Sequence, residues 1–261
     1  MMIWLNDGLV EADAAAISPQ DRGFTLGDGL FETMKAVGGR VLRQDRHFAR
    51  LREGAQVLAL PVPHLDLGAA IAAVLGANRL LDAVVRLTLS RGVGPRGILP
   101  PADARPTLVI AAAPLAAPLP PARMCLSQRT RRNELSPLAR IKSLNYLDNI
   151  IARQEAAARG YDDALLLNTQ GRVAEGTYAN LFVILDGHMV TPPLTEGALP
   201  GILRREVLGA GGREQSLTLA DLERAEEAFL TSSLGIRSIV SIEDRPLLSA
   251  TMADRLRQAV I

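Results

Sequence analysis

The sequence contains very little lysine. Of its 29 basic residues only two, Lys35 and Lys142, are lysine, and the others are arginine. Either residue can form a surface ion pair, but lysine shifts its pKa readily on burial and can then act as a base or form a Schiff base. Lys142 lies between the apolar residues Ile141 and Leu144, so it is a candidate for that chemistry. Composition alone leaves open the alternative that Lys142 is an ordinary residue on a helix surface.

Cysteine, net charge and long apolar runs are also scarce. The single cysteine, Cys125, excludes an intramolecular disulfide, suits a reducing compartment and is expected to be a small buried apolar residue. A net charge of +1 gives no electrostatic basis for binding nucleic acid or an anionic membrane. No apolar run approaches the ~20 residues of a membrane-spanning helix, and the N-terminus lacks the features of a signal peptide. The three histidines show no metal-ligand spacing. We therefore expect a cytoplasmic protein with no metal site.

A proline-rich stretch suggests how the 261 residues divide into domains. Four prolines fall within residues 113–121, which predicts an extended linker over 114–121, because proline suits neither a helix interior nor a central strand. We expect an N-terminal α+β domain over 1–113 and a second domain over 122–261. Only 3% of the residues are aromatic, so aliphatic side chains must fill both cores.

Hydrophobic periodicity predicts most of the regular elements. Apolar residues spaced by three and four predict a helix over 45–58, and alternation predicts strands over 30–37, 83–90 and 107–113. In the second domain we expect helices over 145–159, from about 202, and over 250–260. Three glycines within seven residues, Gly23, Gly27 and Gly29, indicate a backbone with unusual dihedral angles or a close approach to another group.

Several features besides Lys142 suit one phosphorylated cofactor. Glu175 is a carboxylate on a weakly polar strand, and Arg50 projects from the first helix, where it could pair a phosphate bidentately. A helix start after a proline and a hydroxyl-rich turn after a strand offer further phosphate ligands, namely Gly201, Ile202, Leu203, Ser232 and Ser233. Each feature alone has an ordinary structural explanation. Together they match pyridoxal 5'-phosphate (PLP), which needs a lysine, a carboxylate beside the ring nitrogen and a phosphate cup.

The chain also resembles the fold-type IV PLP enzymes, the class IV aminotransferase family. The matching motifs occur in the family's order and span nearly the whole chain: Asp21–Gly23, Gly27–Thr33, His47–Leu51, Ser90–Gly92, Ile141–Tyr146, Glu175–Thr177, Ala179–Phe182, Pro200–Ile202 and Thr231–Ser233. The resemblance implies a two-domain α+β fold with the cofactor between the domains. It also implies a homodimer in which the partner's N-terminal domain closes each site.

The resemblance assigns roles to individual residues. It implies Lys142 as the catalytic Schiff-base lysine and Glu175 as the partner of the ring nitrogen. The phosphate ligands that it implies are Arg50, Ile202, Leu203, Ser232 and Ser233. Three other residues of the matching motifs, Tyr146, Asn180 and Gly201, are also predicted to contact the cofactor.

The branches of this family differ in how they recognise substrate. D-amino-acid aminotransferases hold the substrate carboxylate with a Tyr, an Arg and a His, which fall here on Phe31, Arg96 and Ile98, so two of the three groups are missing. The Phe31–Thr33 motif and the Ser-Arg-Gly…Arg-Gly pattern that contains Arg91 and Arg96 are more like the lyases. We therefore predict a 4-amino-4-deoxychorismate lyase of folate biosynthesis, which releases pyruvate and 4-aminobenzoate. In this prediction Arg91 or Arg96 pairs the substrate carboxylates.

Two alternatives to the lyase remain. One is a class IV aminotransferase, acting on D-amino acids or branched-chain amino acids, which moves the amino group to a 2-oxo acid. This alternative shares the first half of the chemistry with the lyase, so the sequence does not separate them. The other is a cofactor-free binding protein on the same fold, which the presence of Lys142, Glu175 and Arg50 disfavours.

Overall fold

The structure, a computed structural model, describes residues 1–247 and 249–260. It divides into two compact units. Unit 1 comprises Met1–Ala117 and Ile141–Asn145, and unit 2 comprises Pro118–Arg140 and the residues from Tyr146 onward. The first division point lies within the linker predicted over 114–121. The sequence does not predict that Ile141–Asn145 belongs to unit 1. That assignment matters because it places Lys142 in unit 1.

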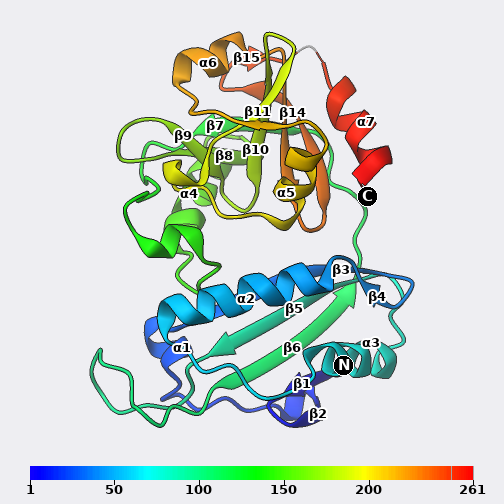
Figure 1. The fold of residues 1–261 in the computed structure, drawn as a ribbon, viewed down its shortest axis with the longest axis vertical. Coiled ribbons are helices and arrows are strands. Elements are labelled where there is room, and N and C mark those ends of the chain that lie inside the picture. Colours follow the sequence, from blue (N-terminus) through cyan, green and yellow to red (C-terminus); the bar gives the residue numbers. More distant parts are fainter. Residues whose placement is uncertain (248, 261) are drawn as a thin grey trace. The chain divides into compact units, whose positions relative to one another are not determined.

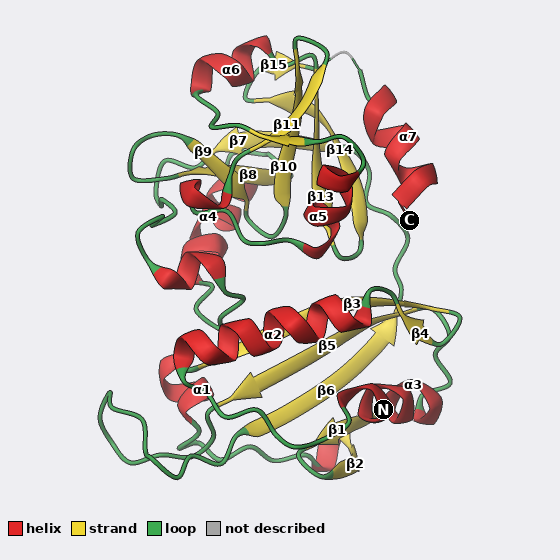
Figure 2. Ribbon diagram, in the orientation of Figure 1, coloured by secondary structure: helices red, strands yellow, loops and turns green. Residues whose placement is uncertain are grey.

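Unit 1 is built on a six-stranded antiparallel sheet with the strand order β2-β1-β6-β5-β3-β4. Its strands are β1 (Met2–Leu5), β2 (Gly8–Glu11), β3 (Gly29–Val37), β4 (Arg40–Val41), β5 (Ala83–Ser90) and β6 (Thr107–Pro114). Its helices are α1 (Arg22–Leu26), α2 (Gln44–Leu58) and α3 (Leu67–Ala77) (Figures 1 and 2). The predicted strands over 30–37, 83–90 and 107–113 and the predicted helix over 45–58 are confirmed to within one residue.

Helix α1 lies in the glycine-rich stretch, where the sequence predicts only an unusual backbone. Asp21 caps this helix by accepting a hydrogen bond from the backbone N–H of Gly23 at 2.7 Å. Gly27 ends it in the left-handed region at φ +67°, which favours glycine. A Cβ on Gly27 would also come within 2.9 Å of the side-chain oxygen of Asn145. The glycines thus serve a short capped helix and its close packing.

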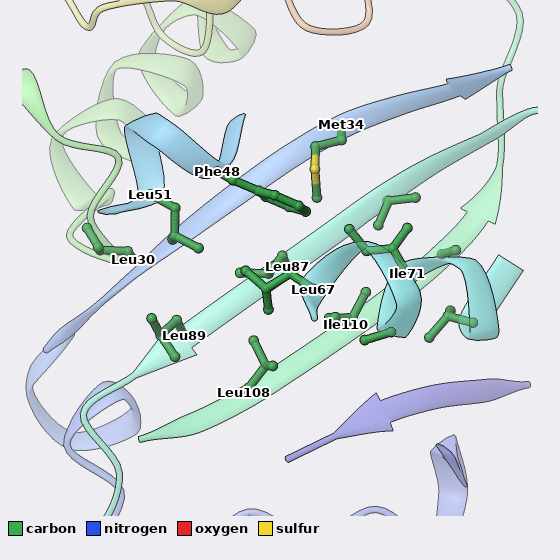
Figure 3. Close-up of a cluster of buried hydrophobic side chains, with 14 of the residues drawn as sticks. Leu30, Met34, Phe48, Leu51, Leu67, Ile71, Leu87, Leu89, Leu108 and Ile110 are labelled. Atoms are coloured by element: carbon green, nitrogen blue, oxygen red, sulfur yellow. The ribbon is translucent and has the colours of Figure 1, made fainter. Parts of the chain in front are cut away.

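One face of the unit 1 sheet forms the hydrophobic core. Leu30 and Met34 of β3 and Leu87 of β5 point into a cluster that Phe48 of α2 and Ile71 of α3 complete (Figure 3). All five side chains are buried. Burial of each contributes about 1.5–3 kcal/mol, so this face holds the unit together. Because side chains alternate along a strand, the residues between them project from the opposite face.

Unit 2 is built on a nine-stranded mixed sheet with the order β12-β11-β10-β13-β14-β7-β8-β9, and β15 pairs with β14. Its strands are β7 (Ala122–Leu126), β8 (Asp163–Leu167), β9 (Val173–Gly176), β10 (Asn180–Leu185), β11 (His188–Thr191), β12 (Arg213–Glu214), β13 (Glu227–Ser232), β14 (Gly235–Ile242) and β15 (Arg245–Pro246). Its helices are α4 (Leu147–Ala158), α5 (Ile202–Gly209), α6 (Leu219–Arg224) and α7 (Thr251–Val260). The helices predicted over 145–159, from about 202 and over 250–260 are confirmed as α4, α5 and α7. No helix in the described ranges is long and apolar enough to cross a lipid bilayer.

Three strands of the unit 2 sheet are buried along their whole length. Every residue of β8, β9 and β10 is buried, which is why these strands are almost continuously apolar. The aromatic rings of Phe182 and Phe229, on the paired strands β10 and β13, stack with their centroids 5.3 Å apart. In such surroundings the charged residue Glu175 on β9 requires polar partners.

Candidate active site

Lys142 lies on a short extended segment that pairs with the edge of β3. The backbone N–H of Phe31 donates to the carbonyl of Lys142 at 2.9 Å, and the N–H of Leu144 donates to the carbonyl of Gly29 at 3.0 Å. An isolated antiparallel bridge joins the same two segments. Lys142 is therefore opposite Phe31, and residues paired in this way project from the same face. Residues 141–145 contain no helix, so the helix-surface alternative for Lys142 is wrong.

Phe31, predicted as a substrate residue, has two cationic neighbours on this face. The ammonium nitrogen of Lys142 lies 4.4 Å from the centre of the Phe31 ring, and the guanidinium carbon of Arg86 lies 3.5 Å from it. Both distances are within the range of a cation–π contact. Arg86 is an exposed residue of β5 and was not among the predicted site residues. The alternation of 83–90 predicts that Arg86 projects from the face of the strand that Val85 and Leu87 do not occupy. The sequence does not reveal that Lys142 lies on the same face as Arg86.

Arg50 projects from α2 toward β3, where it meets a carboxylate. Its Nε and Nη2 donate to Oε1 and Oε2 of Glu32 at 2.8 and 2.6 Å, and Nδ1 of His47 lies 2.6 Å from Oε2. All three side chains are buried. Burial raises the pKa of Glu32, but the charge of Arg50 and the hydrogen bonds from His47 and Arg50 outweigh it, so the pKa lies below its ordinary value. The bidentate contact leaves Nη1 of Arg50 directed away from Glu32.

The two arginines predicted to bind substrate differ in their surroundings. Arg91 is buried, and its Nε donates to Asp28 at 2.7 Å while Nη1 and Nη2 donate to the backbone oxygens of Ala59 and Leu58. All three nitrogens of Arg91 thus have protein acceptors, so its contacts are those of a structural residue. Arg96 is an exposed residue in the loop between β5 and β6.

Glu175 is held by three donors within unit 2. Its Oε2 accepts hydrogen bonds from Nδ2 of Asn180 at 3.2 Å and from the backbone N–H of Leu199 at 2.9 Å. Its Oε1 lies 3.2 Å from Nε of Arg132, which also donates to the backbone oxygen of Gly197. The sequence predicts Glu175 and Asn180 as site residues but not Arg132. It carries no local signal for Arg132, because this residue approaches Glu175 from more than 40 positions away.

The start of α5 provides backbone donors, as the sequence predicts. Gly201 is the residue before the helix and makes no side-chain cap, so the first N–H groups, those of Ile202 and Leu203, are uncapped. A Cβ on Gly201 would come within 1.9 Å of the side-chain oxygen of Asn180, so only glycine fits there. Asn180 therefore joins the Glu175 carboxylate to the helix start.

The end of β13, just before the hydroxyl-rich turn, contributes a residue that was not among the predicted site residues. Thr231 pairs with Asn180 across strands β13 and β10, so its side chain shares a face with that residue. Its hydroxyl is buried and has no hydrogen-bond partner among the described residues. The predicted residues Ser232 and Ser233 are less buried, and the hydroxyl of Ser232 accepts from the backbone N–H of Leu234. An unpaired buried hydroxyl beside an uncapped helix start suits an anionic oxygen.

The segment after Glu175 is tied to α4, the helix that follows Tyr146. Nδ2 of Asn149 donates to the backbone oxygen of Thr177 at 2.7 Å, and the hydroxyl of Thr177 donates to the carboxylate of Asp163. Burial raises the pKa of Asp163, with a partial offset from Thr177. Tyr146 is half-buried and its backbone oxygen accepts from Ile150. The two contacts of Thr177 fix the chain on the C-terminal side of Glu175.

The residues present fit the chemistry of PLP within each unit. Unit 1 supplies an amine at Lys142 and a guanidinium at Arg50. Unit 2 supplies a carboxylate fixed by three donors at Glu175, and uncapped N–H groups with an orphaned hydroxyl at Thr231. These are the groups that a pyridinium nitrogen, an aldehyde and a phosphate need.

Comparison with known proteins agrees with this chemistry. A protein from Methanocaldococcus jannaschii, provisionally assigned as a branched-chain-amino-acid aminotransferase, is 34% identical over 247 residues, which cover 89% of this chain and 84% of the relative. A solved structure from Legionella pneumophila, provisionally assigned as a 4-amino-4-deoxychorismate lyase, has a TM-score of 0.88 at 30% identity and covers 94% of each chain.

A third comparison concerns the cofactor. The T.th. branched-chain amino acid aminotransferase, solved in complex with N-(5'-phosphopyridoxyl)-L-glutamate, has a TM-score of 0.91 at 26% identity, covering 99% of this chain and 92% of that one. The fold is thus that of the fold-type IV PLP enzymes, and the cofactor is pyridoxal 5'-phosphate. The family model for class IV amino-transferases matches residues 29–242, and the chain therefore belongs to the class IV aminotransferase family.

Proposed function

We propose that this chain is a PLP-dependent aminotransferase acting on amino acids. The observation that carries the proposal is the cluster of Lys142, Phe31 and Arg86 on one face of the unit 1 sheet. It combines a candidate base with an arginine able to pair a carboxylate. The Methanocaldococcus relative supports the same activity, and its assigned substrates suggest branched-chain amino acids.

The residues of the chain have separate tasks in this proposal. Bound PLP supplies an aldehyde for the substrate amine and a ring that takes up the electrons released at the substrate carbon. Lys142 would remove the proton from that carbon through Nζ and hold it for return. Glu175 keeps the ring nitrogen protonated, and Arg132 keeps the Glu175 carboxylate in place. Arg86 pairs the substrate carboxylate.

The phosphate has ligands from several elements in the same proposal. The N–H groups of Ile202 and Leu203 and the hydroxyl of Thr231 donate to it, and Ser232 and Ser233 lie in the adjoining turn. Arg50 adds a charged contact. Gly201 keeps the helix start accessible, and Tyr146 and Asn180 contact the cofactor ring or its carboxylate partner.

A lyase is the second candidate function, favoured by the Legionella structure and by the lyase-like motifs around Arg96. In that reaction Lys142 removes the same proton, but the electrons leave through the enolpyruvyl ether, so that pyruvate and 4-aminobenzoate form. The lyase needs cations for the substrate carboxylates. Arg91 is engaged by Asp28 and two backbone oxygens, so that task falls to Arg96 and Arg86.

The test offers the purified protein PLP and two classes of substrate. We expect a visible absorbance band that borohydride removes, and transfer of the amino group from an amino acid to a 2-oxo acid. In Lys142→Ala the rate should fall by about 10²–10⁴-fold or more, because the general base is lost. Release of 4-aminobenzoate from aminodeoxychorismate without transamination would replace this proposal by the lyase. A colourless protein, or full activity in Lys142→Ala, would contradict both.

We also propose a homodimer, as the family resemblance implies. Phe24 and Ile17 are exposed, and both line a hollow of about 390 Å³ on unit 1 together with Val109 and Leu144. Such an apolar hollow is typical of an interaction surface. Light scattering coupled to size exclusion should give twice the chain mass of 27.9 kDa, and a monomer would contradict the proposal.

A further inference from the structure

Glu196 is a buried carboxylate of unit 2 that has no task in the proposed reaction. It ends the short 3-10 helix η3 (Leu194–Glu196), and its side chain is 3% exposed. Its Oε2 accepts from Nδ2 of Asn168 at 2.6 Å and from Nε of Arg172 at 2.7 Å. Its Oε1 accepts from the hydroxyl of Ser216 at 2.5 Å. Donors from two separate segments therefore fix one end of η3.

The contacts of Glu196 make it a firm anchor. Burial raises its pKa, but the charge of Arg172 and the hydrogen bonds from its donors outweigh this, so the pKa lies below its ordinary value. Asn168, one of these donors, is buried, and its Oδ1 accepts from the backbone N–H groups of Gln170 and Arg172 at 3.0 and 2.9 Å. Glu196 and the turn over 168–172 thus hold each other in place.

The segment that follows η3 carries a donor to the candidate active site. Gly197 turns the chain at φ +92°, and its backbone oxygen accepts from Nε of Arg132 at 3.1 Å. The backbone N–H of Leu199 donates to Oε2 of Glu175 at 2.9 Å, and its carbonyl accepts from Nδ2 of Asn180 at 2.8 Å. Both positions of the segment are therefore bound to side chains that also contact Glu175.

The ends of this segment determine where the Leu199 N–H lies. Residues 198–201, between η3 and α5, form no regular structure, so no ladder of backbone hydrogen bonds holds them. Ordering such a segment costs conformational entropy, and a fixed end lowers that cost. Helix α5 fixes one end and Glu196 fixes the other.

We propose that Glu196 is a positioning residue for Glu175. It anchors the segment over 197–199, so that the Leu199 N–H holds the Glu175 carboxylate in the orientation that the ring nitrogen of PLP needs. This inference rests on the proposed function, in which Glu175 is the partner of that nitrogen. Glu196 acts through the backbone of Leu199 and does not itself touch the cofactor.

Hydrogen exchange in the cofactor-free protein tests the anchor directly. The amide of Leu230, on the inner strand β13, serves as the reference for global unfolding. In Glu196→Ala the Leu199 amide should exchange about 10-fold faster relative to that reference, because local opening exposes its N–H. Glu196→Gln should restore most of the protection, since an amide oxygen can still accept from Asn168 and Arg172.

The ring nitrogen of bound PLP gives a readout that a general loss of stability would not move. PLP labelled with ¹⁵N is bound to the whole protein, and the chemical shift of its ring nitrogen reports protonation. Glu196→Ala should move this shift toward the unprotonated value. The dissociation constants for PLP and for pyridoxal, which lacks the phosphate, should rise by the same factor of about 3–10, because both carry the ring nitrogen.

Glu227→Ala is the matched control. Glu227 is also a buried carboxylate of unit 2, but its donors are the hydroxyl of Ser249 and the backbone N–H groups of Met252 and Ala253, at the start of α7. This variant should leave both the ring-nitrogen shift and the relative exchange of Leu199 as they are in the wild type.

The outcomes separate this inference from the proposed function. Equal shifts in Glu196→Ala and Glu227→Ala, or unchanged exchange at Leu199 in Glu196→Ala, would overturn the inference alone. A loss of affinity for PLP but not for pyridoxal would also overturn it, because the phosphate contact would then depend on Glu196. If Glu196→Ala does not fold, Ser216→Ala removes one donor and should give the same changes at a smaller size. A wild-type protein that binds neither form would overturn the proposed function itself.

Discussion

Unit 1 contains two arginine–carboxylate clusters near β3, and their arginines make different contacts. Arg91 gives one nitrogen to Asp28 and the other two to the backbone oxygens of Leu58 and Ala59, at the C-terminal end of α2. It therefore links the end of β5 to the end of a helix. Every one of those acceptors belongs to the protein framework, and the arrangement resembles a structural clamp.

The second cluster concentrates two nitrogens of one arginine on one carboxylate. Arg50 contacts Glu32 through Nε and Nη2, and His47 contacts the same carboxylate. This pairing turns two donors of one guanidinium toward a single buried carboxylate. Similar charges thus occur in two settings: two donors of Arg50 on one buried carboxylate, and the donors of Arg91 divided between a half-buried carboxylate and backbone oxygens.

The largest expected effect is on the free energy of unfolding. It comes from replacing each arginine alone and then together with its carboxylate partner. Arg50→Met and Arg91→Met should each lower the free energy of unfolding of the cofactor-free protein by about 3–5 kcal/mol, because each leaves buried partners unpaired. Adding Glu32→Leu to Arg50→Met should recover part of that loss, because among the printed contacts only the buried ring nitrogen of His47 then lacks its partner. Adding Asp28→Leu to Arg91→Met should recover less, because two backbone oxygens and Nε of Arg22 then lack their partners.

Urea unfolding of the cofactor-free protein measures all four variants. Equal recovery in the two double variants would mean that the two clusters are energetically alike, and would contradict the distinction between them. In the double variant at positions 32 and 50, recovered stability combined with a lost preference for PLP over pyridoxal would show that this cluster serves binding.

Most elements could be predicted from the sequence because they depend on local patterns. The strand over 83–90 follows from alternation, and the helix over 45–58 from apolar residues at spacings of three and four. Lys142 was singled out by composition. Helix α1 was missed because five residues are too short to show a helical period, and its glycines suggested an irregular backbone instead.

The residues missed in the candidate site all depend on long-range pairing. Arg86 is near Lys142 because 141–145 pairs with the edge of β3, more than 100 positions away in the sequence. Thr231 becomes relevant only through its register with Asn180, and Arg132 only through its approach to Glu175. Sequence patterns specify which face a residue occupies within its own strand. They do not specify which distant segment pairs with that strand.

A smaller effect should appear in the pH dependence of stability. Burial raises the pKa of both Glu32 and Asp28, but their arginine partners outweigh it and both values lie below the ordinary ones of 4.5 and 3.8. Such a group stabilises the fold above its unfolded pKa, and that contribution is lost as the pH falls through the folded pKa. The unfolding free energy of the wild type should therefore decrease as the pH falls below about 5.

The two carboxylates should contribute unequally to this acid sensitivity. The side chain of Glu32 is 1% exposed and that of Asp28 is 14% exposed, so solvent screens Asp28 more. Glu32→Gln should flatten the decrease more than Asp28→Asn does. Urea midpoints of the cofactor-free variants between about pH 3 and 7 provide the measurement. A larger effect from Asp28→Asn would mean that the exposed fraction does not determine the difference.

The smallest expected effect comes from the glycine that precedes Asp28. Gly27 has φ +67° and its missing Cβ would meet Asn145 at 2.9 Å, whereas Gly38 has φ +56° with nothing within 4 Å. Gly38→Ala should cost about 1 kcal/mol from backbone strain alone, and Gly27→Ala about 2 kcal/mol, because its contact with Asn145 must also relax. Gly27→Ala disturbs the Asp28 side of β3 and not Arg50, so PLP and pyridoxal affinities should change by the same factor. A selective loss of PLP in Gly27→Ala would mean that the two clusters are coupled through β3, and that the orientation of Arg50 depends on both.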